Sequence, residues 1–98
     1  MPTEENNAAV TSPTTEALIQ YDRFVQEGVS FQIKLKGLME IGAVEPSVVA
    51  ELLEIIVKSK IMADNENLGE KNREFEKQYY TEWLQILAIA MNLGKRRF

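Results

Sequence analysis

Apolar residues recur at helical spacing from residue 17 onwards. They form two adjacent stripes. A serine and a proline stand a few residues before the first apolar residue of these stripes. The first stripe contains Leu18, Tyr21, Val25 and Val29, and the second contains Ala17, Phe24, Phe31, Leu35 and Leu38. Steps of three and four residues place such side chains along one side of a helix. The pattern predicts a helix over about residues 13–41, with Ser12 as its N-cap and Pro13 in its first turn. Gly42 is the predicted stop.

Residues 29–35 also fit a strand, because apolar and polar side chains alternate strictly along them. That period is typical of a half-buried strand. We favour the helix, since the sequence offers no second strand to pair with this one and an unpaired strand is not stable. Gly28 precedes the segment and costs about 1 kcal/mol relative to alanine inside a helix. We therefore expect a bend or break at Gly28.

A second helix is predicted over residues 46–62. Its apolar side chains cover about two-thirds of the helical circumference, and only Glu51, Glu54 and Lys58 form a polar strip. The start is marked either by Glu45 with Pro46 in the first turn, or by Ser47 as the cap.

The third predicted helix, residues 70–93, carries two apolar stripes. Its first two turns are charged, and its second half is strongly apolar. One stripe contains Phe75, Tyr79, Ile86 and Leu93, with Ile89 and Ala90 beside it, and the other contains Tyr80, Leu84, Leu87 and Met91. Trp83 lies between the stripes. Gly94 is the predicted end, and residues 95–98 form a basic tail whose cations suit a helix C-terminus.

These elements predict an all-α fold: one three-helix domain over residues 13–94, preceded by a flexible tail over residues 1–12. The tail has too few large apolar groups to offset its ordering entropy. Two apolar stripes on one helix exceed what a small monomer normally leaves exposed. We therefore expect the domain to pack as a dimeric helical bundle.

The composition excludes much chemistry. The chain has 98 residues, a formal net charge of -4, and neither histidine nor cysteine. It therefore lacks the usual proton-transfer group near neutral pH, the commonest metal ligand and thiolate nucleophiles. We expect no enzymatic activity, no metal site and no cofactor. The longest apolar run, from Trp83 to Leu93, is too short for a membrane span, and no basic leader is evident. We expect a cytoplasmic protein.

The surplus of apolar and aromatic side chains predicts a protein–protein interaction module: an adaptor, an assembly factor or a small regulator that binds another protein or a second copy of itself. Tyrosine, tryptophan and methionine are enriched in interface cores. The predicted partner-binding residues are Tyr80, Trp83, Leu84, Leu87 and Met91.

Two alternatives remain. Residues 13–62 resemble a helix-turn-helix in outline, which would suit a nucleic-acid-associated transcriptional regulator, although the acidic balance makes nucleic acid an unlikely partner. Residues 83–98 could instead lie on a membrane surface. Possible anion contacts are Lys95, Arg96 and Arg97, a weak set because stable anchoring takes two signals.

Overall fold

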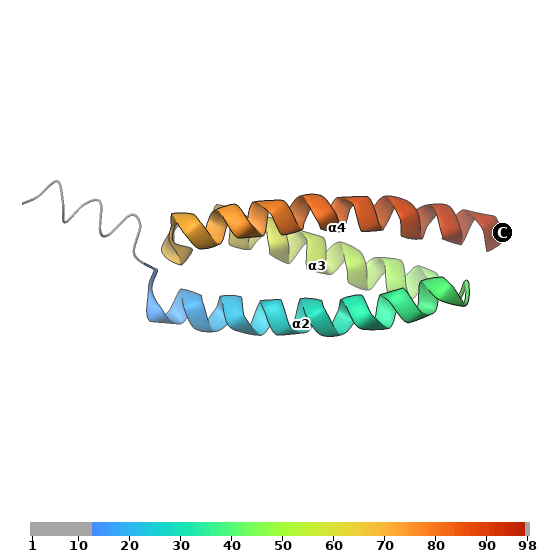
Figure 1. Ribbon diagram of the computed structural model, residues 1–98, viewed down its shortest axis with the longest axis horizontal. Coiled ribbons are helices and arrows are strands. Elements are labelled where there is room, and N and C mark those ends of the chain that lie inside the picture. The colour runs from blue at the N-terminus through green and yellow to red at the C-terminus, as the bar shows by residue number, and fades with distance from the viewer. Residues whose placement is uncertain (1–12, 98) are drawn as a thin grey trace, which may run out of the picture.

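The computed structural model describes residues 13–97, with residues 93–97 described by their backbone alone. Within that range the chain forms three long helices and one short 3-10 turn (Figure 1). These are α2 (Thr15–Glu40), α3 (Pro46–Asp64), η1 (Glu66–Leu68) and α4 (Glu70–Arg97). The predicted all-α class is confirmed. The strand alternative for residues 29–35 is wrong, because these residues form continuous helix in α2.

The first long helix begins later than the sequence suggested. Thr14, not Ser12, is the N-cap, and its side-chain oxygen accepts a hydrogen bond from the amide of Ala17 at 3.1 Å. The amide of Thr14 donates to the carbonyl of Asn67 at 2.8 Å. This bond holds the N-cap of α2 beside η1, so that the helix begins directly after Thr14. Ser12 and the predicted tail over residues 1–12 lie outside the described residues.

Gly42 ends α2, as predicted. Its φ of 67° is a left-handed conformation that glycine adopts without strain. The amide of Gly42 donates to the carbonyl of Met39, and the amide of Ala43 donates to that of Leu38. This pair of bonds is a Schellman motif, which satisfies carbonyl groups left free at the end of a helix. The chain then turns back along α2.

The ends of the other helices agree in part with expectation. α3 begins at Pro46 with Glu45 as its N-cap, the first of the two predicted starts. α4 begins at Glu70, but it continues through Gly94 to Arg97 instead of stopping at the glycine. A single glycine costs only about 1 kcal/mol in a helix, which the flanking helical residues can offset.

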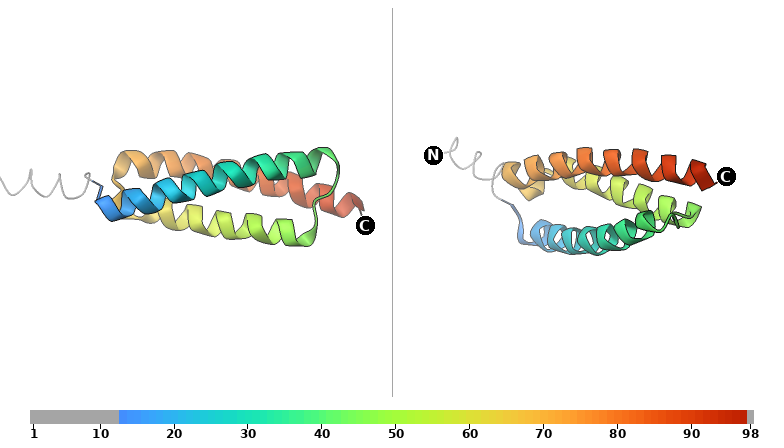
Figure 2. Two further views of the ribbon diagram at one scale, coloured as in Figure 1. Left: turned by 90° about the horizontal axis from the view of Figure 1, so that it is seen from below. Right: turned by 45° about the vertical axis from the view of Figure 1, so that its right-hand side comes forward.

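The helices form a bundle in which α2 and α4 run parallel and α3 runs antiparallel to both (Figures 1 and 2). The packing is uneven, since α3 contacts α4 much more extensively than α2 contacts either of them. The core contains Phe24, Phe31, Leu35, Val44, Val48, Leu52, Ile55, Ile56, Trp83 and Ala90. The uneven packing leaves the side of α2 that faces α4 only partly covered.

The indole of Trp83 reaches from α4 across to α2. Trp83 is only 6% exposed, and its ring centroid lies 6.3 Å from that of Phe31. Gly28 lies against the same indole, where a Cβ atom would be 3.3 Å from Cζ2 of Trp83. The expected break at Gly28 does not occur, because α2 is continuous there. The glycine makes room for the tryptophan.

Candidate functional site

The flank between α2 and α3 is polar. Lys34 Nζ lies 3.1 Å from Glu51 Oε1, and Lys58 Nζ lies 3.0 Å from Glu27 Oε1. The acidic and basic strip predicted on α3 therefore faces α2 and is partly engaged by it. Exposed pairs of this kind contribute little stability, but they make this flank an unsuitable place for an apolar partner.

The side of α4 that faces the bundle interior lies between the two predicted stripes. Glu76, Trp83 and Ala90 follow one another at intervals of seven residues, and all three are buried. An interval of seven residues keeps side chains on one line of a helix that packs along its neighbours. The two stripes therefore lie on either side of the buried line, and each is partly exposed. Their exposed members include Phe75, Tyr79 and Ile89 on one side, and Leu84 and Met91 on the other.

A row of three hollows runs between α2 and α4, and we call it the α2/α4 groove. Adjacent hollows share lining residues, Val25 and Tyr79 in one case and Gln32 in the other. The apolar lining comprises Leu18, Tyr21, Phe24, Val25, Val29, Leu35 and Met39 from α2, and Phe75, Tyr79, Trp83 and Ile86 from α4. On α2 these side chains include the whole first stripe, of which only Tyr21 is even partly buried. The groove is thus a mainly apolar surface between two parallel helices.

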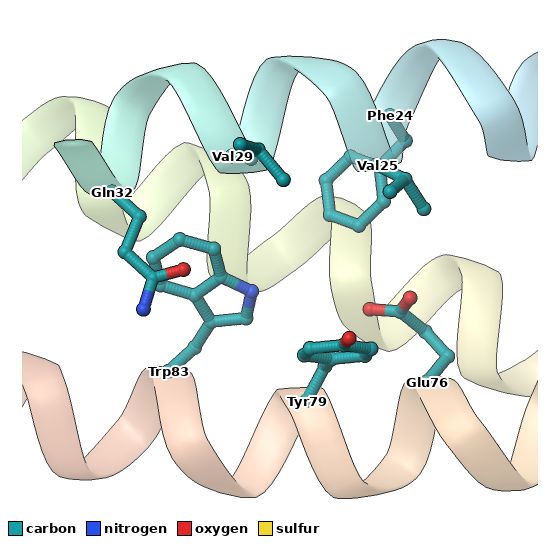
Figure 3. A pocket seen from close by; sticks show the side chains of 8 residues that line it. Phe24, Val25, Val29, Gln32, Glu76, Tyr79 and Trp83 are labelled. Carbon is teal, nitrogen blue, oxygen red and sulfur yellow. The ribbon is translucent and has the colours of Figure 1, made fainter.

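The middle hollow is the most enclosed part of the groove (Figure 3). Phe24, Tyr79, Trp83 and Glu76 line it, together with short side chains from α2. Its volume is about 50 Å³. Pockets for small molecules typically measure roughly 300–1,000 Å³, so the hollow accommodates the end of one side chain and not a whole cofactor.

Glu76 is a buried carboxyl group at the junction of the three helices. Its side chain is 1% exposed and accepts a hydrogen bond from the hydroxyl of Ser59 on α3. The hydroxyl of Tyr21 on α2 donates to it as well. Burial raises the pKa of Glu76, and the two hydrogen bonds oppose that rise because they favour the ionised form. The pKa of Tyr21 is raised to about 12, mainly by burial and then by the charge of Glu76.

The predicted site residues do not form one exposed face. Trp83 is only 6% exposed and packs in the core, so it does not share an exposed face with the other four residues. Tyr80 and Leu87 are half-buried, whereas Leu84 and Met91 are 41% and 47% exposed. The exposed pair therefore belongs to a surface on which Trp83 has no part.

That surface is the flank between α3 and α4. The ammonium of Lys60 on α3 lies 5.9 Å from the centroid of the Tyr80 ring. Leu53 and Val57 precede Lys60 by about two turns and one turn on the same side of α3, and both are exposed. We call this surface the α3/α4 face and define it by Leu53, Val57, Tyr80, Leu84, Leu87 and Met91.

Sequence reasoning missed Glu76 altogether. It stands within two charged turns, Glu70 to Lys77, where it resembles one more surface carboxylate. The available signal was its place seven residues before Trp83, which puts both side chains on the same line. The possible anion contacts Lys95, Arg96 and Arg97 lie where only the backbone is described, so their side chains are not placed.

Within the described range, no cluster of acidic side chains has an arrangement that would hold a metal ion. No helix in that range combines the length and apolar character that a membrane span requires. The chain was compared with family models, curated proteins and solved structures, and none of them matches it.

Proposed function

We propose that this chain is a non-enzymatic protein–protein interaction module, an adaptor, assembly factor or small regulator of the cytoplasm, and that its main binding surface is the α2/α4 groove. The observation that carries the proposal is the row of apolar side chains that two parallel helices leave uncovered along this groove. A surface helix normally turns such a stripe towards the core, and large exposed apolar patches mark interaction sites.

The shape of the groove favours one occupant, an amphipathic helix of another protein. Its two walls present apolar residues at steps of three and four, as in Leu18, Tyr21 and Val25. A helix laid between them would complete a four-helix arrangement, the usual way in which helices bury such stripes. The bound helix would need an apolar stripe of its own at the same spacing.

Charge along the groove selects for a basic partner helix. Apart from tyrosines, four ionisable side chains line the three hollows. Three are acidic, Asp22, Glu40 and Glu76, and one is basic, Lys36. Complementary charge chiefly provides specificity and a faster encounter. A helix with lysine or arginine beside its apolar stripe therefore suits this groove better than an acidic one.

The test uses two designed peptides that share one leucine stripe and differ only in lysine or glutamate at the flanking positions. The fluorescence of Trp83, the one tryptophan of the chain, reports binding because Trp83 lines the groove. We expect the lysine peptide to bind more tightly. Val29→Asp should weaken its binding at least about tenfold, because it places a charge on the apolar wall.

Ile33→Asp is the matched control. Ile33 is 70% exposed, one turn along α2 from Val29, and lines none of the hollows. Equal effects of the two substitutions, or no binding of either peptide, would contradict the groove proposal.

A second candidate function is self-association through the α3/α4 face, which corresponds to the dimer expected from the sequence. Leu53, Val57, Leu84 and Met91 are exposed there, and none of the six residues that define this face is charged. A two-fold contact brings one patch against itself, so an uncharged apolar centre is self-complementary. Light scattering at low micromolar concentration tests this proposal. We expect a dimer that Leu84→Asp converts to a monomer and that Gln85→Asp, one residue away, leaves intact; a monomeric wild type would contradict it.

A further inference from the structure

The middle hollow of the α2/α4 groove has the lining of a cation site. Three aromatic rings and one carboxyl group surround a common space between the two helices (Figure 3), namely those of Phe24, Tyr79, Trp83 and Glu76. The face of an aromatic ring carries partial negative charge and attracts ammonium groups. Cages of such rings bind methylated lysine and choline in this way.

The carboxyl group in this lining has no cationic partner among the described residues. Its hydrogen-bond donors are the hydroxyls of Ser59 and Tyr21, and none of the ion pairs between described residues includes it. A buried carboxylate without a cation is costly. A positive charge that entered the hollow would offset this cost.

The size of the hollow restricts the ligand. Its volume of about 50 Å³ is far below the roughly 300–1,000 Å³ typical of small-molecule pockets. It opens onto the groove beside Val25 and Val29, both of which are exposed. A group that reaches Glu76 must therefore be small, and the groove beside the opening has room for a longer chain that carries it.

We propose that this hollow binds the alkylammonium head of a lysine or methylated lysine, carried by the helix that docks in the α2/α4 groove. The statement that the lysine comes from a docked helix rests on the proposed function. The statement that the hollow binds an alkylammonium group does not depend on it. Glu76 supplies the negative charge, and Tyr79 and Trp83 supply aromatic faces. Phe24 contributes a third ring from the opposite wall.

The first experiment tests the hollow without any peptide. The full-length protein is titrated with tetramethylammonium chloride, with sodium chloride at the same ionic strength and with tert-butanol, a neutral molecule of similar size. The indole N–H signal of Trp83 is followed by NMR. We expect a saturable shift with tetramethylammonium alone. A shift of equal size with tert-butanol, or no shift beyond that of sodium chloride, would overturn the proposal.

Two variants and one control assign the binding to these residues. Glu76→Gln and Tyr79→Leu should each weaken tetramethylammonium binding about 5- to 10-fold, since each removes one source of attraction. Tyr79 is half-exposed, so Tyr79→Leu remains informative even if Glu76→Gln perturbs folding. Glu82→Gln, which neutralises an exposed carboxylate on the same helix, should have no effect. Unchanged binding in Tyr79→Leu would overturn the proposal.

A peptide pair separates this proposal from the proposed function. The two helices are identical except for one central residue of the stripe, lysine in one and norleucine in the other. Binding of both with equal affinity would support the groove and overturn the cation site. Binding of tetramethylammonium without binding of either peptide would support the cation site and contradict the groove as a helix-docking surface.

Discussion

Gly28 on α2 lies directly against the indole of Trp83 on α4, and a Cβ atom at Gly28 would be 3.3 Å from Cζ2 of that ring. The separation is tighter than ordinary van der Waals contact. The reach of the indole from α4 to the backbone of α2 therefore depends on the absence of a side chain at Gly28. Since Trp83 also lines the middle of the α2/α4 groove, the same pair determines the shape of the proposed site.

Substitution of Gly28 tests this relationship. Gly28→Leu should displace the indole and cost about 1–3 kcal/mol of unfolding free energy, as overpacking typically does. Gly37→Ala is the matched control, because Gly37 is on the same helix and a Cβ atom there would have nothing within 4 Å of it. It should stabilise the protein by about 0.5–1 kcal/mol through helix propensity alone. Urea unfolding of both variants measures the difference, and similar effects would contradict the role assigned to Gly28.

Glu76 predicts a pH dependence of stability. Burial raises its pKa in the folded protein, so folding favours the protonated carboxyl group. Stability from this group is then fully present below the pKa of the unfolded chain and is lost as the pH rises through the folded-state pKa. Tyr21 on α2 and Ser59 on α3 are the groups that face it from the other helices.

Glu76→Gln should abolish the loss of stability that accompanies rising pH. It should also make the protein more stable than the wild type at neutral pH. Thermal unfolding between pH 4 and pH 8 compares it with Glu82→Gln, in which an exposed carboxylate six residues further along α4 is changed instead. A Glu76→Gln variant that keeps the wild-type pH dependence would show that another group is responsible.

Ser59 contributes to the same junction from α3. Its hydroxyl is fully buried and donates to Glu76. Ser59→Ala should cost about 1–3 kcal/mol, because it leaves a buried carboxyl group short of a donor. Ser47→Ala, an exposed serine on the same helix, should change the unfolding free energy by less than about 0.5 kcal/mol. Equal effects in chemical denaturation would contradict the structural importance of the junction.

Trp83 and Leu84 are adjacent residues with different predicted roles. Trp83→Ala should cost about 3–5 kcal/mol, as expected for a large core side chain, and should destabilise the monomer itself. Leu84→Ala, with its side chain 41% exposed, should cost less than about 1 kcal/mol while weakening any self-association. Unfolding free energies and light scattering together distinguish the two. A larger loss of stability for Leu84→Ala would reverse the assignment.

The sequence by itself determined the helical class, the approximate helix positions and the turn at Gly42. These features depend on local rules: steps of three and four, a glycine that adopts positive φ, and a proline in a first turn. The apolar stripes on α2 and α4 were also visible in it. Local rules failed at Gly28 and Gly94, where a glycine predicts an interruption and the helix nevertheless continues.

Only the tertiary structure decided which side of α4 is buried. The two stripes are similarly apolar, so neither their composition nor their spacing shows which of them is buried. The rotation of α4 about its axis is determined by packing against α3 and by the contact of Trp83 with Phe31 and Gly28. That rotation buries the line from Glu76 to Ala90 and leaves both stripes at the edges. Glu76 becomes a core residue among charged neighbours for the same reason. Its burial depends on which side of α4 the other helices cover, and the local sequence pattern does not determine that side.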